Sequence, residues 1–181
     1  MRRPTIYIIL TIGLALCGAV PASAETLGEL AQEAIVSQCP DLMSYAGDLA
    51  DEPGIVARGY TFVRTVDHPR AGTVEQVRLS RDDGEIIISN ARDTSFCQVA
   101  FSGTGARAVF DRLLADPSAI GENLHPDESD LGMQPMLQGL QPVTLRSDTI
   151  EGQYLGVQFV DLGPIDATAS LIIQQYVLEE E

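Results

Sequence analysis

Two histidines with acidic neighbours are the side chains best suited to acid–base chemistry in this sequence. His68 follows Asp67, and His125 opens a run that also contains Asp127. A histidine oriented by a carboxylate can act as a general base, but the two groups must meet in space and not only in sequence. Both histidines precede a proline, which is typical of loops, so a solvated histidine is the simpler interpretation. A secreted hydrolase using His68 or His125 with a nearby carboxylate therefore stays an alternative function.

The segment from His125 to Asp130 combines this histidine with the carboxylates of Asp127, Glu128 and Asp130. Carboxylate oxygens can bind calcium. The run lacks the alternating acidic positions, the central glycine and the distal glutamate of an EF-hand loop, so no metal site is expected. A charged loop that faces water is the simpler interpretation. As a surface feature, it is the candidate partner-binding loop.

Cys39 and Cys97 are the two cysteines expected in the mature chain, and a single pair in an exported protein is typical of a disulfide. The alternatives are two buried free thiols or a metal pair, but neither histidine stands at a ligand spacing from the cysteines. No Cys-x-x-Cys motif is present, which disfavours redox catalysis. The loop would span 97 − 39 = 58 positions. Loop-closure entropy then gives a stabilisation of roughly 4 kcal/mol.

The Gly103-Thr104-Gly105 segment lies where a helix is expected to begin, which invites a phosphate-binding interpretation. It has neither the Gly-Lys-Ser/Thr ending of a P-loop nor the third glycine of a dinucleotide-binding turn, because Ala108 fills that place. No Gly-x-Ser-x-Gly motif occurs. The chain has no tryptophan and only 6% aromatic residues, so few side chains are available to stack against a sugar ring in a binding cleft. The sequence therefore assigns no catalytic residue and no cofactor.

The first 24 residues have the pattern of a secretory signal peptide. Arg2 and Arg3 precede an apolar run over residues 6–20, and the small-residue triplet Ala22-Ser23-Ala24 follows as a cleavage site. The run is short for a bilayer span of about 20 residues, so we expect no stable membrane insertion after cleavage. A lipoprotein anchor at Cys17 is disfavoured by the bulky Leu16 before it. The expected location is periplasmic or secreted.

The charge balance is strongly acidic. The whole chain has a formal net charge of −15 and no lysine; without Arg2 and Arg3, nine arginines stand against 26 acidic residues, so the charge is 9 − 26 = −17. Such a chain repels nucleic acid and anionic membranes, and long-range attraction favours a basic protein as partner. Solubility alone is the simpler explanation of the acidity.

Apolar spacing predicts a helical start for the mature chain. Thr26 and Glu29 form a capping box ahead of a helix that has its apolar stripe over residues 27–35 and Cys39 at its end. A second helix is expected from Pro40, with one side formed by Leu42, Tyr45, Ala46 and Leu49. The segment Asp51-Glu52-Pro53-Gly54 is predicted to be the connecting loop.

A strand followed by a helix is expected to form the centre of the core. Alternation places Cys97, Val99 and Phe101 on one face of the strand, and a helix over residues 106–114, capped by Thr104, then presents an apolar side. Further strands are predicted over residues 59–66, 73–81, 85–90, 143–147, 155–160 and 167–178. A hairpin turn is predicted at residues 82–84.

The segment 117–142 is predicted to be a long irregular loop, with a possible helical turn over residues 133–140. The remaining pattern predicts a single α+β domain over residues 25–181, with a mainly antiparallel sheet covered by N-terminal helices and one inserted helix, and stapled by one disulfide. The favoured function is an exported, non-enzymatic, acidic module, of the inhibitor or immunity kind, that binds a basic protein. The alternatives are the hydrolase and an envelope structural protein.

Overall fold

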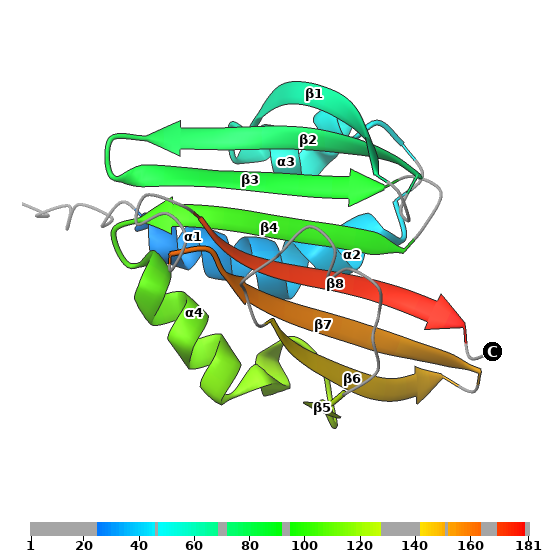
Figure 1. Cartoon of the computed structure of the whole chain (residues 1–181). Helices are drawn as coiled ribbons and strands as arrows, with labels where there is room; N and C mark the ends of the chain where they lie inside the picture. Colours follow the sequence, from blue (N-terminus) through cyan, green and yellow to red (C-terminus); the bar gives the residue numbers. More distant parts are fainter. Residues whose placement is uncertain are drawn as a thin grey trace, which may run out of the picture.

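The computed structural model describes residues 25–45, 47–68, 72–91, 95–127, 142–150, 152–163 and 170–179. Within them, eight strands form one antiparallel sheet in the order β1-β2-β3-β4-β8-β7-β6-β5 (Figure 1). The strands are β1 (Thr61–His68), β2 (Gly72–Arg81), β3 (Gly84–Ala91), β4 (Phe96–Gly103), β5 (His125–Pro126), β6 (Val143–Ile150), β7 (Gln153–Asp161) and β8 (Leu171–Glu179). The predicted α+β class with a mainly antiparallel sheet is confirmed.

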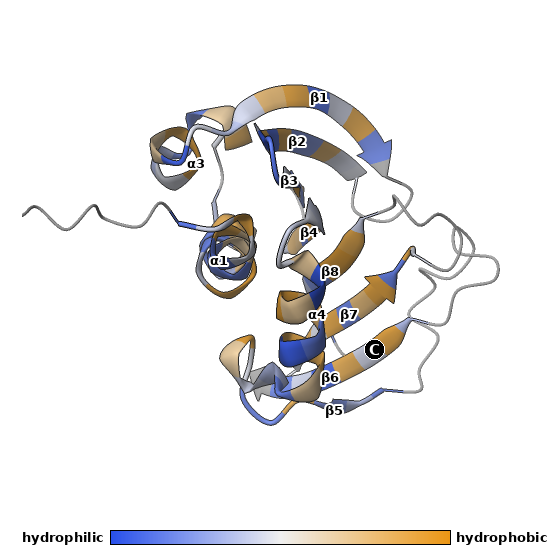
Figure 2. Cartoon of the chain, turned by 90° about the vertical axis from the view of Figure 1, so that its left-hand side faces the viewer, coloured by the Kyte–Doolittle hydropathy of each residue, from blue (hydrophilic) through white to orange (hydrophobic). Residues whose placement is uncertain are grey.

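The labelled helices α1, α3 and α4 lie on one side of this sheet (Figure 2). The N-terminal helical layer is made of a continuous run of α1 (Leu27–Glu33), a π-helical turn η1 (Ala34–Gln38) and α2 (Cys39–Met43), together with the 3₁₀ turn η2 (Leu49–Asp51) that follows it. The layer is followed by α3 (Pro53–Ala57), whereas α4 (Ala106–Ala115) and the 3₁₀ turn η3 (Pro117–Ala119) follow β4. The predicted capping box at Thr26 and Glu29 is confirmed.

The main core lies between these helices and the sheet. The predicted alternation in β4 is confirmed, because Cys97, Val99 and Phe101 are fully buried in the main hydrophobic cluster. From α4, Phe110 packs its ring edge-on against Phe159 of β7, with ring centroids 5.7 Å apart. The strand and helix predicted to be central therefore do meet in the core.

The predicted cap of α4 is wrong. The N-cap position is Gly105, at φ +81°, and no side chain caps the helix. The Thr104 amide instead donates to the Asp83 carbonyl at 2.8 Å, in the turn that joins β2 to β3. A Cβ added to Gly103 would lie 2.1 Å from that same Asp83 oxygen, so this glycine allows the close approach of the two segments.

Two further details of the N-terminal half differ from the prediction. The second helix ends at Met43, and Leu49 lies in η2. The segment predicted as a connecting loop contains the start of α3, where the Glu52 carboxylate accepts the Ile55 amide hydrogen at 2.7 Å and Pro53 occupies the first turn. A helix of five residues offers too little periodic pattern to be recognised from sequence.

One row of facing positions in β2, β3, β4 and β8, here called the tether row, holds the N-terminal helical layer on the sheet. Its members are Glu75, Asn90, Cys97 and Gln175, which face one another in register. Each reaches a different point of the layer: Glu75 accepts from the Leu49 amide at 2.6 Å, Asn90 donates to the Leu42 carbonyl at 3.0 Å, Cys97 is disulfide-bonded to Cys39, and Gln175 donates to the Ile35 carbonyl at 2.6 Å.

The π-helical turn explains why Gln175 is needed. The Cys39 amide bonds to the Ala34 carbonyl, five residues back, so the next donor in this register would be residue 40. That residue is Pro40, which has no amide hydrogen. The Ile35 carbonyl is thereby left without a backbone donor, and the Gln175 amide supplies one from the sheet.

The opposite face of the sheet carries a row of polar side chains at facing positions, here called the amide row. Its members, from β1 to β6, are Arg64, Gln76, Ser89, Gln98, Gln174, Gln158 and Thr144. Hydrogen bonds of 2.8 and 3.0 Å join its first three members, and longer contacts of 3.5 and 3.4 Å join its last three. Gln98 in the middle makes no side-chain hydrogen bond in the described structure.

The described elements form two halves, each with helical structure followed by a four-stranded antiparallel meander. Helices precede the meander β1–β4, and α4 precedes the meander β5–β8, and the last strand of each half pairs with the other at the centre of the sheet. No helix in the described part of the chain is long and apolar enough to cross a membrane. The predicted helical turn near residues 133–140 lies outside the described residues, as do residues 1–24.

Candidate protein-binding surface

The disulfide predicted between Cys39 and Cys97 is present, with Cα atoms 5.5 Å apart and a sequence separation of 58. Both cysteines are fully buried, Cys39 in the helical layer and Cys97 in β4. Their neighbours in the tether row are Asn90 and Gln175, whose side chains bond to backbone and not to a ligand. The bridge is therefore part of the scaffold and not a reactive site.

The two histidines lie on opposite edge strands. His68 is the last residue of β1, and His125 is the first residue of β5, at the far edge of the sheet. The His125 ring nitrogen Nδ1 lies 3.1 Å from the Asn123 carbonyl oxygen, and no described carboxylate bonds to the ring. The structure therefore does not bring the histidines together, and His125 is not part of a histidine–carboxylate pair.

The predicted partner-binding loop is only partly within the described residues. His125 faces Arg146 of β6, and the Asp127 amide donates to the Thr144 carbonyl at 3.0 Å. Glu128 and Asp130 lie outside the described residues. No group of three metal-ligating side chains occurs in the part of the chain that the structure describes.

A polar and aromatic cluster that the sequence did not suggest lies beside His125. The Arg146 guanidinium stands 4.0 Å from the centroid of the Tyr154 ring and pairs with Asp148 at 2.6 Å. The Tyr176 ring covers Gly156, where an added Cβ would lie 2.1 Å from it. Burial, followed by the charges of Tyr154 and Asp127, raises the pKa of the Tyr176 hydroxyl.

Every arginine within the described residues has a partner inside the protein. Five of them pair with carboxylates: Arg58 with Glu25 and Glu33, Arg78 with Glu85, Arg81 with Asp83, Arg107 with Asp111 and Asp161, and Arg146 with Asp148. The remaining two, Arg64 and Arg112, donate to the side-chain oxygens of Gln76 and Gln32. The hydrogen bond from Arg107 also holds the pKa of the Asp161 carboxyl below its usual value.

Six exposed carboxylates have no arginine or other hydrogen-bond donor as a partner among the described residues. They are Asp41, Asp51, Asp67, Asp82, Glu122 and Glu179. Other acidic side chains accept hydrogen bonds at helix ends. The Thr26 amide and hydroxyl lower the pKa of Glu29, and the Ser118 hydroxyl and amide lower the pKa of Asp116. Within the described part of the chain, the negative charge of these six side chains is thus not compensated by arginines.

The first edge of the sheet combines three features of a docking surface. Strand β1 has one neighbour, β2, and on its other side no described strand pairs with it. Two adjacent apolar side chains, Phe62 and Val63, are exposed on it at a register irregularity. The free carboxylate of Asp67 follows five positions after Phe62. This edge is the candidate protein-binding surface.

The sequence contained a signal for part of this surface. The strand segment was predicted, but its adjacent Phe62 and Val63 interrupt the period-2 alternation, as a β-bulge does. Comparison of the chain with protein-family models, with curated proteins and with solved structures finds no significant match. The function is therefore argued from the residues of this chain.

Proposed function

We propose that this chain is an exported, non-enzymatic module that binds a basic protein. The observation that carries the proposal is the imbalance of charged groups: each described arginine is engaged within the protein, whereas six exposed carboxylates are free. Exposed charges of one sign attract a partner of the other sign over about 8 Å at physiological ionic strength.

The first test is the salt dependence of binding. The mature protein, immobilised, is incubated with envelope extract at low and high salt, and each retained protein is purified and its dissociation constant measured. We expect a basic partner whose affinity falls as the salt concentration rises. The proposal is contradicted if no retained protein shows salt-dependent affinity.

Variants that remove carboxylate charges test which part of the surface binds the partner. Three acids of the helical layer and β1 are replaced together in Asp41→Asn/Asp51→Asn/Asp67→Asn, and the matched control removes three charges elsewhere in Asp82→Asn/Glu122→Gln/Glu179→Gln. Exposed pairs contribute about 0.2–1 kcal/mol each, so the first variant should bind about tenfold more weakly. Equal losses in the two variants would show that net charge alone, and no defined surface, governs binding.

The exported location is tested separately. Mass spectrometry of the protein from its native host should find a mature N-terminus at Glu25, with residues 1–24 removed. An acylated N-terminal Cys17 would instead establish a lipoprotein and contradict a free exported module. Among the described residues, no specific contact favours the hydrolase or the structural alternative, and we propose neither.

A further inference from the structure

Strand β1 is the longer and less protected of the two sheet edges in the described structure. It has eight residues, and six of the seven side chains from Thr61 to Asp67 are exposed. At the other edge, β5 has two residues, one of which is Pro126, and it pairs with only Leu145 and Arg146 of β6; the remaining six residues of β6 have no described strand on that side. A short edge strand with a proline resists pairing with another chain, whereas a long exposed edge offers its outer backbone groups to one.

The irregularity in β1 places apolar side chains at this edge. The pairing register with β2 shifts between Phe62 and Arg64, so Val63 is the inserted residue of a bulge. Phe62 is 52% exposed and Val63 36% exposed, and Val56, on the helix that leads into β1, is 57% exposed. These are three of the five large hydrophobic side chains exposed in the described structure, the others being Val143 and Leu178.

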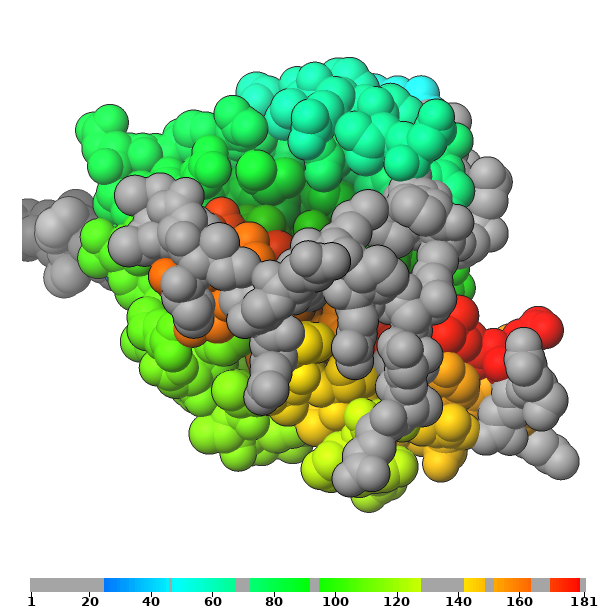
Figure 3. Space-filling view, in the orientation of Figure 1, coloured from blue at the N-terminus to red at the C-terminus, as the bar shows by residue number. Residues whose placement is uncertain are grey.

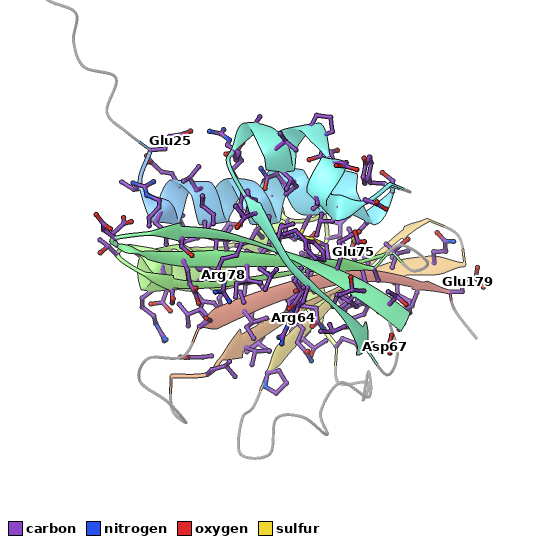
Figure 4. All side chains as sticks on the ribbon, turned by 90° about the horizontal axis from the view of Figure 1, so that it is seen from above. Glu25, Arg64, Asp67, Glu75, Arg78 and Glu179 are labelled. Atoms are coloured by element: carbon purple, nitrogen blue, oxygen red, sulfur yellow. A yellow bond between two sulfur atoms is a disulfide. The ribbon has the colours of Figure 1, made fainter. Side chains whose placement is uncertain are left out.

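The same edge also carries an unpaired negative charge. Figure 4 looks down on β1, with Arg64 near its middle and Asp67 toward its C-terminal end. Arg64 donates to Gln76 at 2.8 Å and is engaged, whereas the exposed Asp67 carboxylate has no partner in the described structure. In the space-filling view, the cyan and teal atoms of this edge form the top of the molecule (Figure 3).

The register shows that the apolar and acidic groups share a side of the sheet. Phe62, Thr65 and Asp67 face Val77, Glu75 and Thr73 of β2, and Val77 and Glu75 point to the helical layer. Directly opposed residues of antiparallel strands present their side chains on the same face. Asp67 and Val63 are four residues apart, which corresponds to about 13 Å along a strand.

We propose that β1 binds an extended segment of the basic partner by antiparallel strand addition. The segment carries an arginine or lysine opposite Asp67 and, four residues later, an apolar residue opposite the Phe62–Val63 bulge. Main-chain hydrogen bonds to the edge provide affinity, and the two side-chain positions provide specificity. The inference rests on the proposed function, since it names the surface and the segment by which a basic partner is held.

The test uses a nine-residue synthetic peptide with arginine at position 3 and leucine at position 7. Three control peptides change one feature each: arginine replaced by glutamate, the two residues exchanged, and proline at position 5 to block backbone pairing. Binding to the mature protein is measured by calorimetry, and hydrogen exchange reports on the amides of β1. We expect the first peptide to bind, to protect residues 61–68 from exchange, and to lose roughly tenfold or more in affinity with each control change.

Protein variants complete the test. Phe62→Ala and Asp67→Asn should each weaken the first peptide by roughly tenfold, whereas the matched controls Val143→Ala and Asp82→Asn should leave its affinity unchanged. Because all four positions are exposed, the variants should keep the circular dichroism spectrum and melting temperature of the parent protein. Equal binding of all peptides, or protection elsewhere than β1, would overturn the inference.

The failure of this inference is distinguishable from failure of the proposed function. If the edge variants bind the salt-sensitive basic partner as tightly as the parent does, the partner uses another surface and only strand addition is refuted. If light scattering shows a concentration-dependent dimer that Phe62→Asp abolishes, the edge serves a second copy of this chain and the inference is wrong. If no salt-sensitive partner exists, the proposed function itself fails.

Discussion

Replacing Gln175 by methionine tests the link between the π-helical turn and the sheet. Gln175 is 1% exposed, and its amide is the donor to the Ile35 carbonyl, which Pro40 deprives of a backbone donor. Methionine keeps the length of the side chain and removes the donor, so the buried Ile35 carbonyl is left unsatisfied, which costs about 1–3 kcal/mol. It also removes the buried Gln175 Oε1, which has no hydrogen-bond partner in the described structure, so the net loss should lie toward the lower end of that range. For a chain of this size the melting temperature should fall by roughly 2–4 °C for each kcal/mol.

The assay is urea unfolding of the oxidised mature protein, with thermal unfolding alongside. The matched control is Gln98→Met, the same change in the same sheet at a side chain that makes no hydrogen bond; it should alter the free energy of unfolding by less than about 0.5 kcal/mol. A double-mutant cycle with Pro40→Ala provides the decisive comparison, because alanine restores an amide hydrogen at position 40.

In the Pro40→Ala background, the restored amide can donate to the helical carbonyls, so Gln175→Met should cost about 1 kcal/mol less than in the parent. An identical cost in both backgrounds would refute the assignment of Gln175 as the substitute donor. A loss no larger than that of Gln98→Met would refute the claim that the hydrogen bond stabilises the fold at all.

Three further predictions follow from the same structure. Thiol titration of the unfolded, unreduced protein should find no free thiol, and Cys39→Ala/Cys97→Ala should lower the free energy of unfolding by about 4 kcal/mol. Burial raises the folded-state pKa of Tyr60 and of Tyr176 above the unfolded value of 10.0, so the folded state retains protons as pH rises past 10. Stability should therefore fall above about pH 10 in urea titrations, and less steeply in Tyr176→Phe. Gly156→Ala places a Cβ against the Tyr176 ring, so calorimetry should show a loss of about 1–3 kcal/mol.

Local patterns in the sequence were sufficient for most of the elements. The alternation of Cys97, Val99 and Phe101 and the helical spacing after Gly105 are properties of short segments, and both elements formed as predicted. The α4 cap was predicted wrongly, because a close approach of the Asp83 turn, remote in sequence, determines what Thr104 does. Contacts between distant segments decide such details, and they are not visible in local propensity.

The tether row could not be predicted for the same reason. Glu75, Asn90 and Gln175 are polar, and sequence reasoning assigns such residues to solvent. They are buried because strand pairing places them under three backbone groups that need partners. Only the disulfide member of the row was recognised in advance, since two cysteines allow a single intrachain connectivity.

The candidate surface on β1 was not predicted from the sequence. The acidic surplus is a property of composition, and it suggested only the charge of a partner and not the surface that would bind it. The sequence analysis predicted a binding loop that contains His125 and Asp127, whereas the candidate surface is β1, at the other end of the sheet. Which strand becomes the edge depends on the sheet order, and that order follows from the pairing of β8 with β4, some 70 positions apart in the chain.

The central position of β8 has a consequence for how a newly made chain matures. Phe101 of β4 pairs with Leu171 of β8. A ribosome that adds roughly 5–20 residues per second synthesises Leu171 roughly 4–14 s after Phe101. Until β8 is made, the backbone groups of β4 that pair with β8 have no strand partner. The N-terminal half is therefore vulnerable to aggregation unless a chaperone or an unfolded, secretion-competent state protects it. Loss of the last ten residues would remove β8, the strand through which the second meander pairs with the first, and we expect such a truncated chain to be degraded.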